Sequence, residues 1–339
     1  MLRWTPLPAA ILVVLALVAP PAKAQFDRDP NKLTVAVGGK TNIAYLPLPV
    51  AYYRGFFRDE SVNVAIQDVQ NGPKAVEALV GGSADMVYGA IDYAFLLQPK
   101  GVDIVSVYLG ANLSAIVLGL PPEKARAYTG PADLKGMIIG VTGPGGAAEN
   151  MLRILLAKGG LSLADVSSVG VGSGATAIAA METGKIQGIV LADPVIMRLT
   201  VDGFILPVVD TRTLAGQSFV YGGPAALAGA TSTDDYLRYH RDLVQRCVNA
   251  LVKASKWLHT ATDDEIATAL PPEFYGGDKA IFLKVLAANR DIFTKDGRTT
   301  PQEEQVAYRQ VLETGRLPPG QNTDFDKIFV RDFTEAANR

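Results

Sequence analysis

The amino-acid sequence predicts a two-lobed α/β protein in which each lobe holds a mainly parallel sheet flanked by helices. From Leu33 onward, short runs rich in β-branched residues alternate with helical stretches, an order that is typical of βαβ units. The same order begins again at Met137, 104 positions later. Two similar lobes joined by two crossings of the chain are therefore expected.

The strands and helices of the two repeats correspond along the chain. Leu33 falls 104 positions before Met137, and Gly72 falls 102 positions before Gly174, although shared composition alone could give some of these matches. The first repeat predicts strands at 33–37, 62–66 and 85–89 with helices at 50–57 and 73–80; the second predicts strands at 137–141, 166–171 and 186–191 with helices at 147–158, 175–182 and after Pro194.

Two β-rich stretches with a glycine break, 103–120 and 219–228, are predicted to cross between the lobes. After Thr231 the pattern becomes helical, and these later helices are expected to pack on lobe 1. The predicted division is a signal peptide of residues 1–24, a discontinuous lobe 1 of residues 25–112 plus 221–339, and a lobe 2 of residues 113–220; the later helices are expected near 277–292, 300–314 and 323–336.

The first residues have the features of a secretory signal peptide. Arg3 precedes an apolar run at 9–19 that is too short to span a bilayer, and the small outer residues of 22–24 suit a signal peptidase. A retained membrane anchor is the alternative, but no Lys/Arg-rich flank follows the run. The residue after the predicted cut is Gln25 rather than a lipid-accepting cysteine. We therefore expect a secreted, soluble protein that is not lipid-anchored.

Composition limits the possible functions. The 339 residues are 48% hydrophobic and 19% charged, which excludes disordered and fibrous classes of protein. The net charge of −2 offers no basic surface that would attract nucleic acid. The single cysteine, Cys247, lies in an apolar periodic stretch and is predicted to be a buried core thiol. His240 and His259 fall in the predicted C-terminal helices, and no CxxC or HExxH spacing occurs. No metal, cofactor or catalytic residue is therefore predicted.

Glycine loops follow the first strand of each repeat, at 38–42 and 142–146, and both lie at predicted helix entrances. Free backbone N–H groups and the helix dipole favour an anion there, such as a carboxylate or a sulfonate. Simple tight turns between strand and helix are the alternative. Neither loop has the P-loop or GxGxxG pattern, so ATP and NAD are not expected.

The third strand of each repeat ends near an aspartate, Asp92 in the first and Asp193 in the second. A carboxylate pair can act in acid and base catalysis, but each aspartate also opens a helix, where N-capping is the usual role. Binding of a ligand amine is a third interpretation. Ser173 lies between two glycines without the GxSxG spacing of a nucleophile elbow, so a turn and a helix cap explain it better.

Tyrosines near the strand ends could line a cleft or fill the core. Tyr45 lies in a predicted loop, and Tyr221 precedes a Gly-Gly-Pro break, so both lie where the backbone bends toward the predicted cleft. They are the tyrosines that we expect to contact a ligand.

Four segments resemble the periplasmic solute-binding proteins of ABC importers, in the nitrate/sulfonate/taurine class of the type II binding-protein fold. The resemblance covers the mature chain and is strongest in LTVAVGGKTNIAYLPLPVAYYRGFFRDESVNV, GPKAVEALVGGSADMVYG, DLKGMIIGVTGPGGAAENMLRILLAKGGL and AAMETGKIQGIVLADPVI. It implies hinge closure of two lobes around a solute that a membrane permease then receives, in the periplasm. It points to ligand contacts at Gly39, Lys40, Thr41, Asn42, Tyr45, Gly89, Ala90, Asp92, Asn112, Gly145, Gly146, Ser173 and Asp193.

The sequence departs from this class at the lobe-2 pocket. Some members place a histidine or tryptophan there, whereas this chain has Ala192, Asp193 and Pro194. The identity of the ligand therefore stays open.

The predicted function is a monomeric receptor for a small organic anion. Two alternatives share the fold. One is a sensory module that presents a ligand to a membrane receptor. The other resembles a thiamine-pyrimidine synthase that consumes its own histidine, which is disfavoured because both histidines lie far along the chain from the glycine loops.

Overall fold

A computed structural model describes residues 29–69, 71–317 and 320–339. Contacts divide the chain into Met1–Pro30 and Asn31–Arg339, and the second unit holds every helix and strand considered below. The predicted signal peptide, residues 1–24, lies outside the described residues. Within the described ranges, no helix is both long and apolar enough to cross a membrane.

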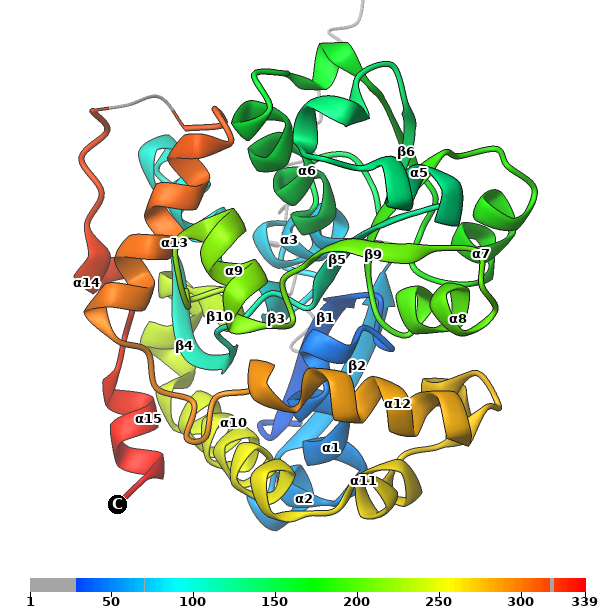
Figure 1. The fold of residues 1–339 in the computed structure, drawn as a ribbon. Coiled ribbons are helices and arrows are strands. Elements are labelled where there is room, and N and C mark those ends of the chain that lie inside the picture. The colour runs from blue at the N-terminus through cyan, green and yellow to red at the C-terminus, as the bar shows by residue number, and fades with distance from the viewer. Residues whose placement is uncertain (1–28, 70, 318–319) are drawn as a thin grey trace, which may run out of the picture. The chain divides into compact units, whose positions relative to one another are not determined.

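The first sheet has five strands in the order β2-β1-β3-β10-β4. β1 runs parallel to β2 and β3, and β10 lies antiparallel between β3 and β4 (Figure 1). β10 joins this sheet from far along the chain, so the sheet is discontinuous in sequence. The strands span Lys32–Gly38 (β1), Asn63–Val69 (β2), Met86–Ala90 (β3), Ile104–Ala111 (β4) and Ala228–Thr233 (β10).

The second sheet repeats this arrangement in the order β7-β6-β8-β5-β9, with β5 as its antiparallel strand. β5 follows the first crossing between the sheets and β10 follows the second, and each is the antiparallel strand of the sheet that it joins. The predicted α/β fold with two mainly parallel sheets is confirmed. The strands span Ile116–Leu120 (β5), Ile138–Val141 (β6), Ser167–Gly170 (β7), Gly188–Ala192 (β8) and Leu206–Asp210 (β9).

Several helices agree closely with the sequence predictions, and α6 and α7 have the predicted bounds. The described helices are α1 (Pro47–Tyr53), α2 (Phe56–Asp59), α3 (Gly72–Val80), α4 (Asp92–Leu97), α5 (Pro122–Ala127), α6 (Ala147–Lys158), α7 (Ala175–Glu182), α8 (Val195–Val201), α9 (Leu214–Tyr221), α10 (Asp234–Thr260), α11 (Asp263–Ala269), α12 (Lys279–Asn289), α13 (Pro301–Glu313), α14 (Phe325–Ile328) and α15 (Asp332–Ala337), with six short 3₁₀ turns between them.

Three predictions of secondary structure are wrong in detail. The helix predicted near 323–336 is two short helices, α14 and α15, with residues 329–331 between them. The helix predicted at 50–57 is divided into α1 and α2, because Gly55 between them has a φ of +79° that ends the first helix. The stretch 219–228 was predicted to be rich in β-structure, but its first three residues belong to α9, which ends at Tyr221. Thr213 caps that helix by accepting a hydrogen bond from Gly216 N, and Gly222 ends it with a φ of +82°.

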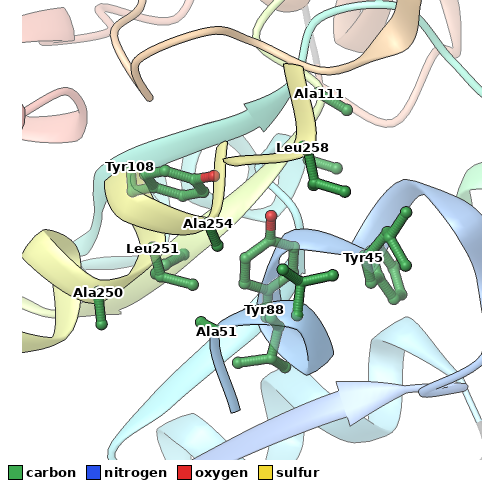
Figure 2. Packing of buried hydrophobic residues seen from close by; sticks show 14 of the residues in the cluster. Tyr45, Ala51, Tyr88, Tyr108, Ala111, Ala250, Leu251, Ala254 and Leu258 are labelled. Atoms are coloured by element: carbon green, nitrogen blue, oxygen red, sulfur yellow. The ribbon is translucent and has the colours of Figure 1, made fainter. Parts of the chain in front are cut away.

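Tyrosines and the long helix α10 fill the core beside the first sheet. Tyr45 packs edge-on against Tyr88 with ring centroids 5.9 Å apart, and Tyr108 lies beyond Tyr88 (Figure 2). The Tyr108 hydroxyl is 2.6 Å from the hydroxyl of Ser255 on α10. Cys247 is 1% exposed in the same cluster, so the prediction of a core thiol is confirmed. The helix α12 also packs in this core through Ile281, Phe282, Val285 and Leu286.

Candidate functional site

A cavity lies between the two sheets and is lined from both. Its volume is about 90 Å³, which is room for several water molecules or a small organic molecule. Five of the predicted ligand residues line it, namely Asn42, Tyr45, Ala90, Asp92 and Tyr221. Two of these, Tyr45 and Tyr221, are the tyrosines that the sequence placed at the cleft.

A smaller space adjoins this cavity at the entrance of α6. The two share six lining residues, so they lie on either side of the same side chains: Asn42, Tyr45, Ala90, Ile116, Ala147 and Ala192. Gly146 is the N-cap of α6 and has no side chain to bind the N–H groups of Ala147 and Ala148, whereas Gly145 N just before it donates to Glu149 Oε2 at 2.9 Å. Gly146, Ala147 and Ala148 line the smaller space, so the positive end of a twelve-residue helix lies beside it.

Asp92, at the start of α4, is the charged residue among the described side chains of the main cavity. Its Oδ2 accepts hydrogen bonds from Asn150 Nδ2 at 2.9 Å and from Arg316 Nη1 at 3.1 Å. Its Oδ1 is buried and has no partner among the described residues. Burial raises the pKa of Asp92 above its ordinary value, and Arg316 is the largest of the influences that oppose this rise.

Two buried amides belong to the polar lining, which also includes Asn42, Ser114 and Thr314. Asn150 on α6 is 9% exposed and Gln310 on α13 is 8% exposed. Asn150 Oδ1 and Gln310 Nε2 have no hydrogen-bond partner among the described residues. Buried polar atoms are normally satisfied by protein, water or a ligand, so the cavity has unmet capacity for both donors and acceptors.

The tyrosine hydroxyls of the cavity stay protonated. Burial raises the pKa of Tyr45 to about 12, with a smaller contribution from the charge of Asp92. Burial likewise raises the pKa of Tyr221. Neither side chain can serve as a base near neutral pH, so each acts as a neutral hydroxyl.

Asp193 lies outside the described lining of the cavity and is 2% exposed. Its Oδ1 accepts from Met197 N at 2.8 Å, which agrees with the capping interpretation. Its Oδ2 accepts from Arg212 Nη1 at 2.9 Å and from Asn289 Nδ2 at 2.7 Å. Asp92 and Asp193 thus each have their own arginine, which is not the arrangement of a catalytic carboxylate pair.

The loop after β1 does not present the free N–H groups that the sequence suggested. Gly39 N and Lys40 N both donate to Asp68 Oδ1, at 3.0 and 3.1 Å. The chain then enters a 3₁₀ turn at Ile43–Tyr45 rather than an α-helix, and Asn42 caps that turn. The predicted α-helix entrance is therefore wrong for this loop, and a carboxylate of the protein takes two of the donors that were expected to bind an anion.

The remaining predicted residues lie along the contact between the lobes or away from it. Lys40 pairs with Glu273 at 3.2 Å, and Gly145 O accepts a 3.0 Å hydrogen bond from Tyr93 Oη. A Cβ added to Gly39 would lie 2.9 Å from Ser173 Oγ. Thr41 and Ser173 line a separate surface pocket, Gly89 pairs with Gly229 inside the first sheet, and Asn112 binds Glu303.

Sequence reasoning missed the contribution of α13 to the site. Ala307, Gln310 and Val311 from this helix line the cavity, followed by Thr314. The apolar periodicity predicts the helix itself, but nothing in the sequence shows which face of the sheet it covers.

The fold and the cavity define the class of protein. Two five-stranded sheets, each with one antiparallel strand and with a cavity between them, form the architecture of type II periplasmic binding proteins. The chain belongs to the NMT1-like family, whose model matches residues 28–270.

Comparisons with individual proteins agree with this class. A solved structure of a Bordetella bronchiseptica RB50 protein has 36% sequence identity and a TM-score of 0.84, over 91% of this chain and 97% of that chain. The alkanesulfonate-binding protein SsuA from Xanthomonas axonopodis pv. citri, solved with bound MOPS, is 22% identical and shares the fold, with a TM-score of 0.67 over 85% of this chain and 96% of that chain.

A curated enzyme gives a partial match. The 4-amino-5-hydroxymethyl-2-methylpyrimidine phosphate synthase of Schizosaccharomyces pombe is 31% identical over 143 residues, which is 42% of this chain and 40% of the synthase. The chain therefore matches less than half of the length of that relative.

Proposed function

We propose that this chain is a periplasmic solute-binding protein that captures a small organic acid between its lobes and delivers it, as a monomer, to an ABC permease. In this proposal residues 1–24 direct secretion and are removed, and lobes of residues 25–112 plus 221–339 and of residues 113–220 close on the ligand. The observation that carries the proposal is the convergence of Asp92, Asn150 and Gln310 on one cavity, each with a buried unpartnered atom. A bound ligand would satisfy these atoms.

The charges around the cavity narrow the chemistry of the ligand. No lysine or arginine occurs among the described residues that line the main cavity or the adjoining space. An anionic group would therefore depend on the N–H groups at the start of α6, beside Gly146. Asp92 would repel a second anion but would accept a hydrogen bond from an amine or hydroxyl. An organic acid that also carries such a donor meets both requirements.

Binding without turnover is the function that the side chains favour. The S. pombe relative is named as a synthase, but neither His240 nor His259, both on α10, is among the described residues lining the cavity. The buried tyrosines have raised pKa values, and each aspartate is paired with an arginine. None of these groups is arranged as a nucleophile with its base.

Thermal unfolding with four molecules of similar size tests the proposal. We expect 4-aminobutanoate to raise the unfolding temperature most, butanoate and butane-1-sulfonate less, and butylamine least, because a ligand that binds only the folded state stabilises it. Asp92→Asn should remove the advantage of 4-aminobutanoate over butanoate. The exposed Asp242 provides a matched control, Asp242→Asn, which should preserve that advantage. Absence of any shift with the acids, or an equal shift with butylamine, would reject the proposed ligand class.

A further inference from the structure

One wall of the cavity belongs to a segment that the family model does not describe. The match to the NMT1-like family ends at residue 270, whereas α13 spans Pro301–Glu313. Gln310 and Val311 from this helix lie in the lining of the cavity. This wall of the cavity therefore lies outside the segment that the family model matches.

The start of α13 is fixed to both crossings between the lobes. Glu303 Oε1 accepts a 2.8 Å hydrogen bond from Asn112 Nδ2, which follows β4 at the first crossing. The backbone oxygen of Glu303 accepts from Ala226 N, which precedes β10 at the second crossing, at 3.1 Å. Ala225 N also donates to Asn112 O at 2.9 Å and so ties the crossings together. Gln310 lies about two turns further along this anchored helix.

The Gln310 amide differs from the other buried polar group of α13. Glu304 is 2% exposed, and both of its carboxylate oxygens bind the guanidinium of Arg331, at 2.6 to 3.1 Å. Gln310 is 8% exposed, and its Nε2 has no partner among the described residues. The Nε2 group of Gln310 is therefore an unmet donor in a residue that lines the cavity. A ligand oxygen within reach of this group would satisfy it.

We infer that Gln310 is a specificity-determining residue whose side-chain amide donates a hydrogen bond to an oxygen atom of the bound ligand. This inference rests on the proposed function, because it takes the cavity as the ligand site. It assigns α13 a role in selecting among ligands by their oxygen acceptors. A carboxylate or sulfonate oxygen fits this donor, whereas an alkyl or ammonium group does not.

A pair of glutamines on α13 provides the test. Gln310→Leu removes the buried amide, and Gln305→Leu makes the same change at an exposed position of the same helix. In the absence of ligand we expect neither variant to lower the unfolding temperature of the full chain. In calorimetric titrations we expect Gln310→Leu to raise the Kd of 4-aminobutanoate and butanoate about tenfold, and Gln305→Leu to leave both unchanged.

Two results would overturn the inference. A lower unfolding temperature for ligand-free Gln310→Leu would show that the amide supports the fold. An unchanged Kd of 4-aminobutanoate and butanoate would show that the amide donates no hydrogen bond to their oxygen atoms. If the wild-type protein binds neither acid, the proposed ligand class fails, and the ligand-free comparison still decides whether the amide is structural.

Discussion

The side-chain amide of Asn289 donates a 2.7 Å hydrogen bond to Asp193 Oδ2 and thereby joins the two lobes. Asn289 ends α12, which packs in the core beside the first sheet, whereas Asp193 follows β8 of the second sheet. Close by, Ile43 N donates to the backbone oxygen of Asp193 at 3.3 Å. These contacts link the second sheet to elements that pack beside the first, so they stabilise the arrangement of the two sheets in this structure.

Asn289→Leu should therefore weaken ligand binding by destabilising the closed arrangement. A hydrogen bond to a charged group contributes about 1.5 to 3 kcal/mol, so the Kd of 4-aminobutanoate should rise roughly tenfold or more. Titration calorimetry measures this change. The control is Asn249→Leu, since Asn249 Nδ2 binds Glu60 Oε2 at 3.0 Å within the first lobe. If the control weakens binding as much as Asn289→Leu, the contact to Asp193 has no special role in closure.

Arg212→Met should destabilise the fold strongly. The Arg212 side chain is 8% exposed and pairs with Asp193 at 2.9 Å and with Asp210 at 2.6 Å. Removing one partner of a buried ion pair leaves the other charge unpaired, which lowers the free energy of unfolding by about 3 to 5 kcal/mol. Urea unfolding measures this value. The exposed pair of Arg238 with Asp234 is the control, and Arg238→Met should cost about 1 kcal/mol or less.

The carboxyl of Asp92 should make stability depend on pH. Burial raises its pKa above the ordinary value of 3.8, although Arg316, the backbone N–H of Tyr93 and Asn150 oppose the rise. Between pH 3.8 and the raised pKa, the Asp92 carboxyl is therefore protonated in the folded state and already ionised in the unfolded state. As pH rises from 3.8 through the raised pKa, Asp92 lowers the free energy of unfolding, and the loss is complete above that pKa.

Asp92→Asn removes this dependence. Between pH 3.8 and the raised pKa of Asp92, the free energy of unfolding of the Asp92→Asn variant should rise relative to that of the wild type. Urea unfolding at several pH values measures this difference. If the free energy of unfolding depends on pH in the same way in both proteins, the pKa of Asp92 is not raised in the folded state.

Local patterns were enough to predict the architecture but not the partners of each polar group. Apolar periodicity and a glycine at the helix entrance gave α6 its predicted bounds at Ala147–Lys158. The two donors of Gly39 and Lys40 looked free in the sequence because their acceptor, Asp68, lies 29 and 28 residues away at the end of β2. Gln310 was missed for the same reason. Its place in the cavity depends on how α13 packs, and packing between distant elements has no local signature.

Cys247 should not react with thiol reagents in the native protein. It is 1% exposed in the core, and burial raises the pKa of its thiol to about 12. The thiolate is the reactive form, so both access and ionisation oppose the reaction. Labelling with iodoacetamide at neutral pH should be undetectable in native buffer and complete in guanidinium chloride. Rapid labelling without denaturant would mean that α10 opens readily from the core.

Tyr93→Phe tests a second contact between the lobes. The Tyr93 hydroxyl donates a 3.0 Å hydrogen bond to Gly145 O in the loop before α6, and its ring lies 5.5 Å from the guanidinium of Arg316. Phenylalanine keeps the ring and removes only the hydroxyl, which bonds Gly145 and also interacts with Arg316, so the core should remain packed. Loss of about 0.5 to 1.5 kcal/mol from the closed arrangement would raise the Kd of 4-aminobutanoate roughly two- to tenfold, with little change in the unfolding temperature.

Tyr53→Phe is the matched control for this change. The Tyr53 hydroxyl lies 3.5 Å from Glu273 Oε1 at an exposed position, so its removal should leave the Kd unchanged. Titration calorimetry and thermal unfolding of both variants show whether the Tyr93 hydroxyl supports the fold or the closure of the lobes on a ligand. If Tyr93→Phe lowers the unfolding temperature and leaves the Kd unchanged, the hydroxyl supports the fold and not the closure of the lobes. A raised Kd at constant unfolding temperature means that the bond to Gly145 forms as the ligand is enclosed.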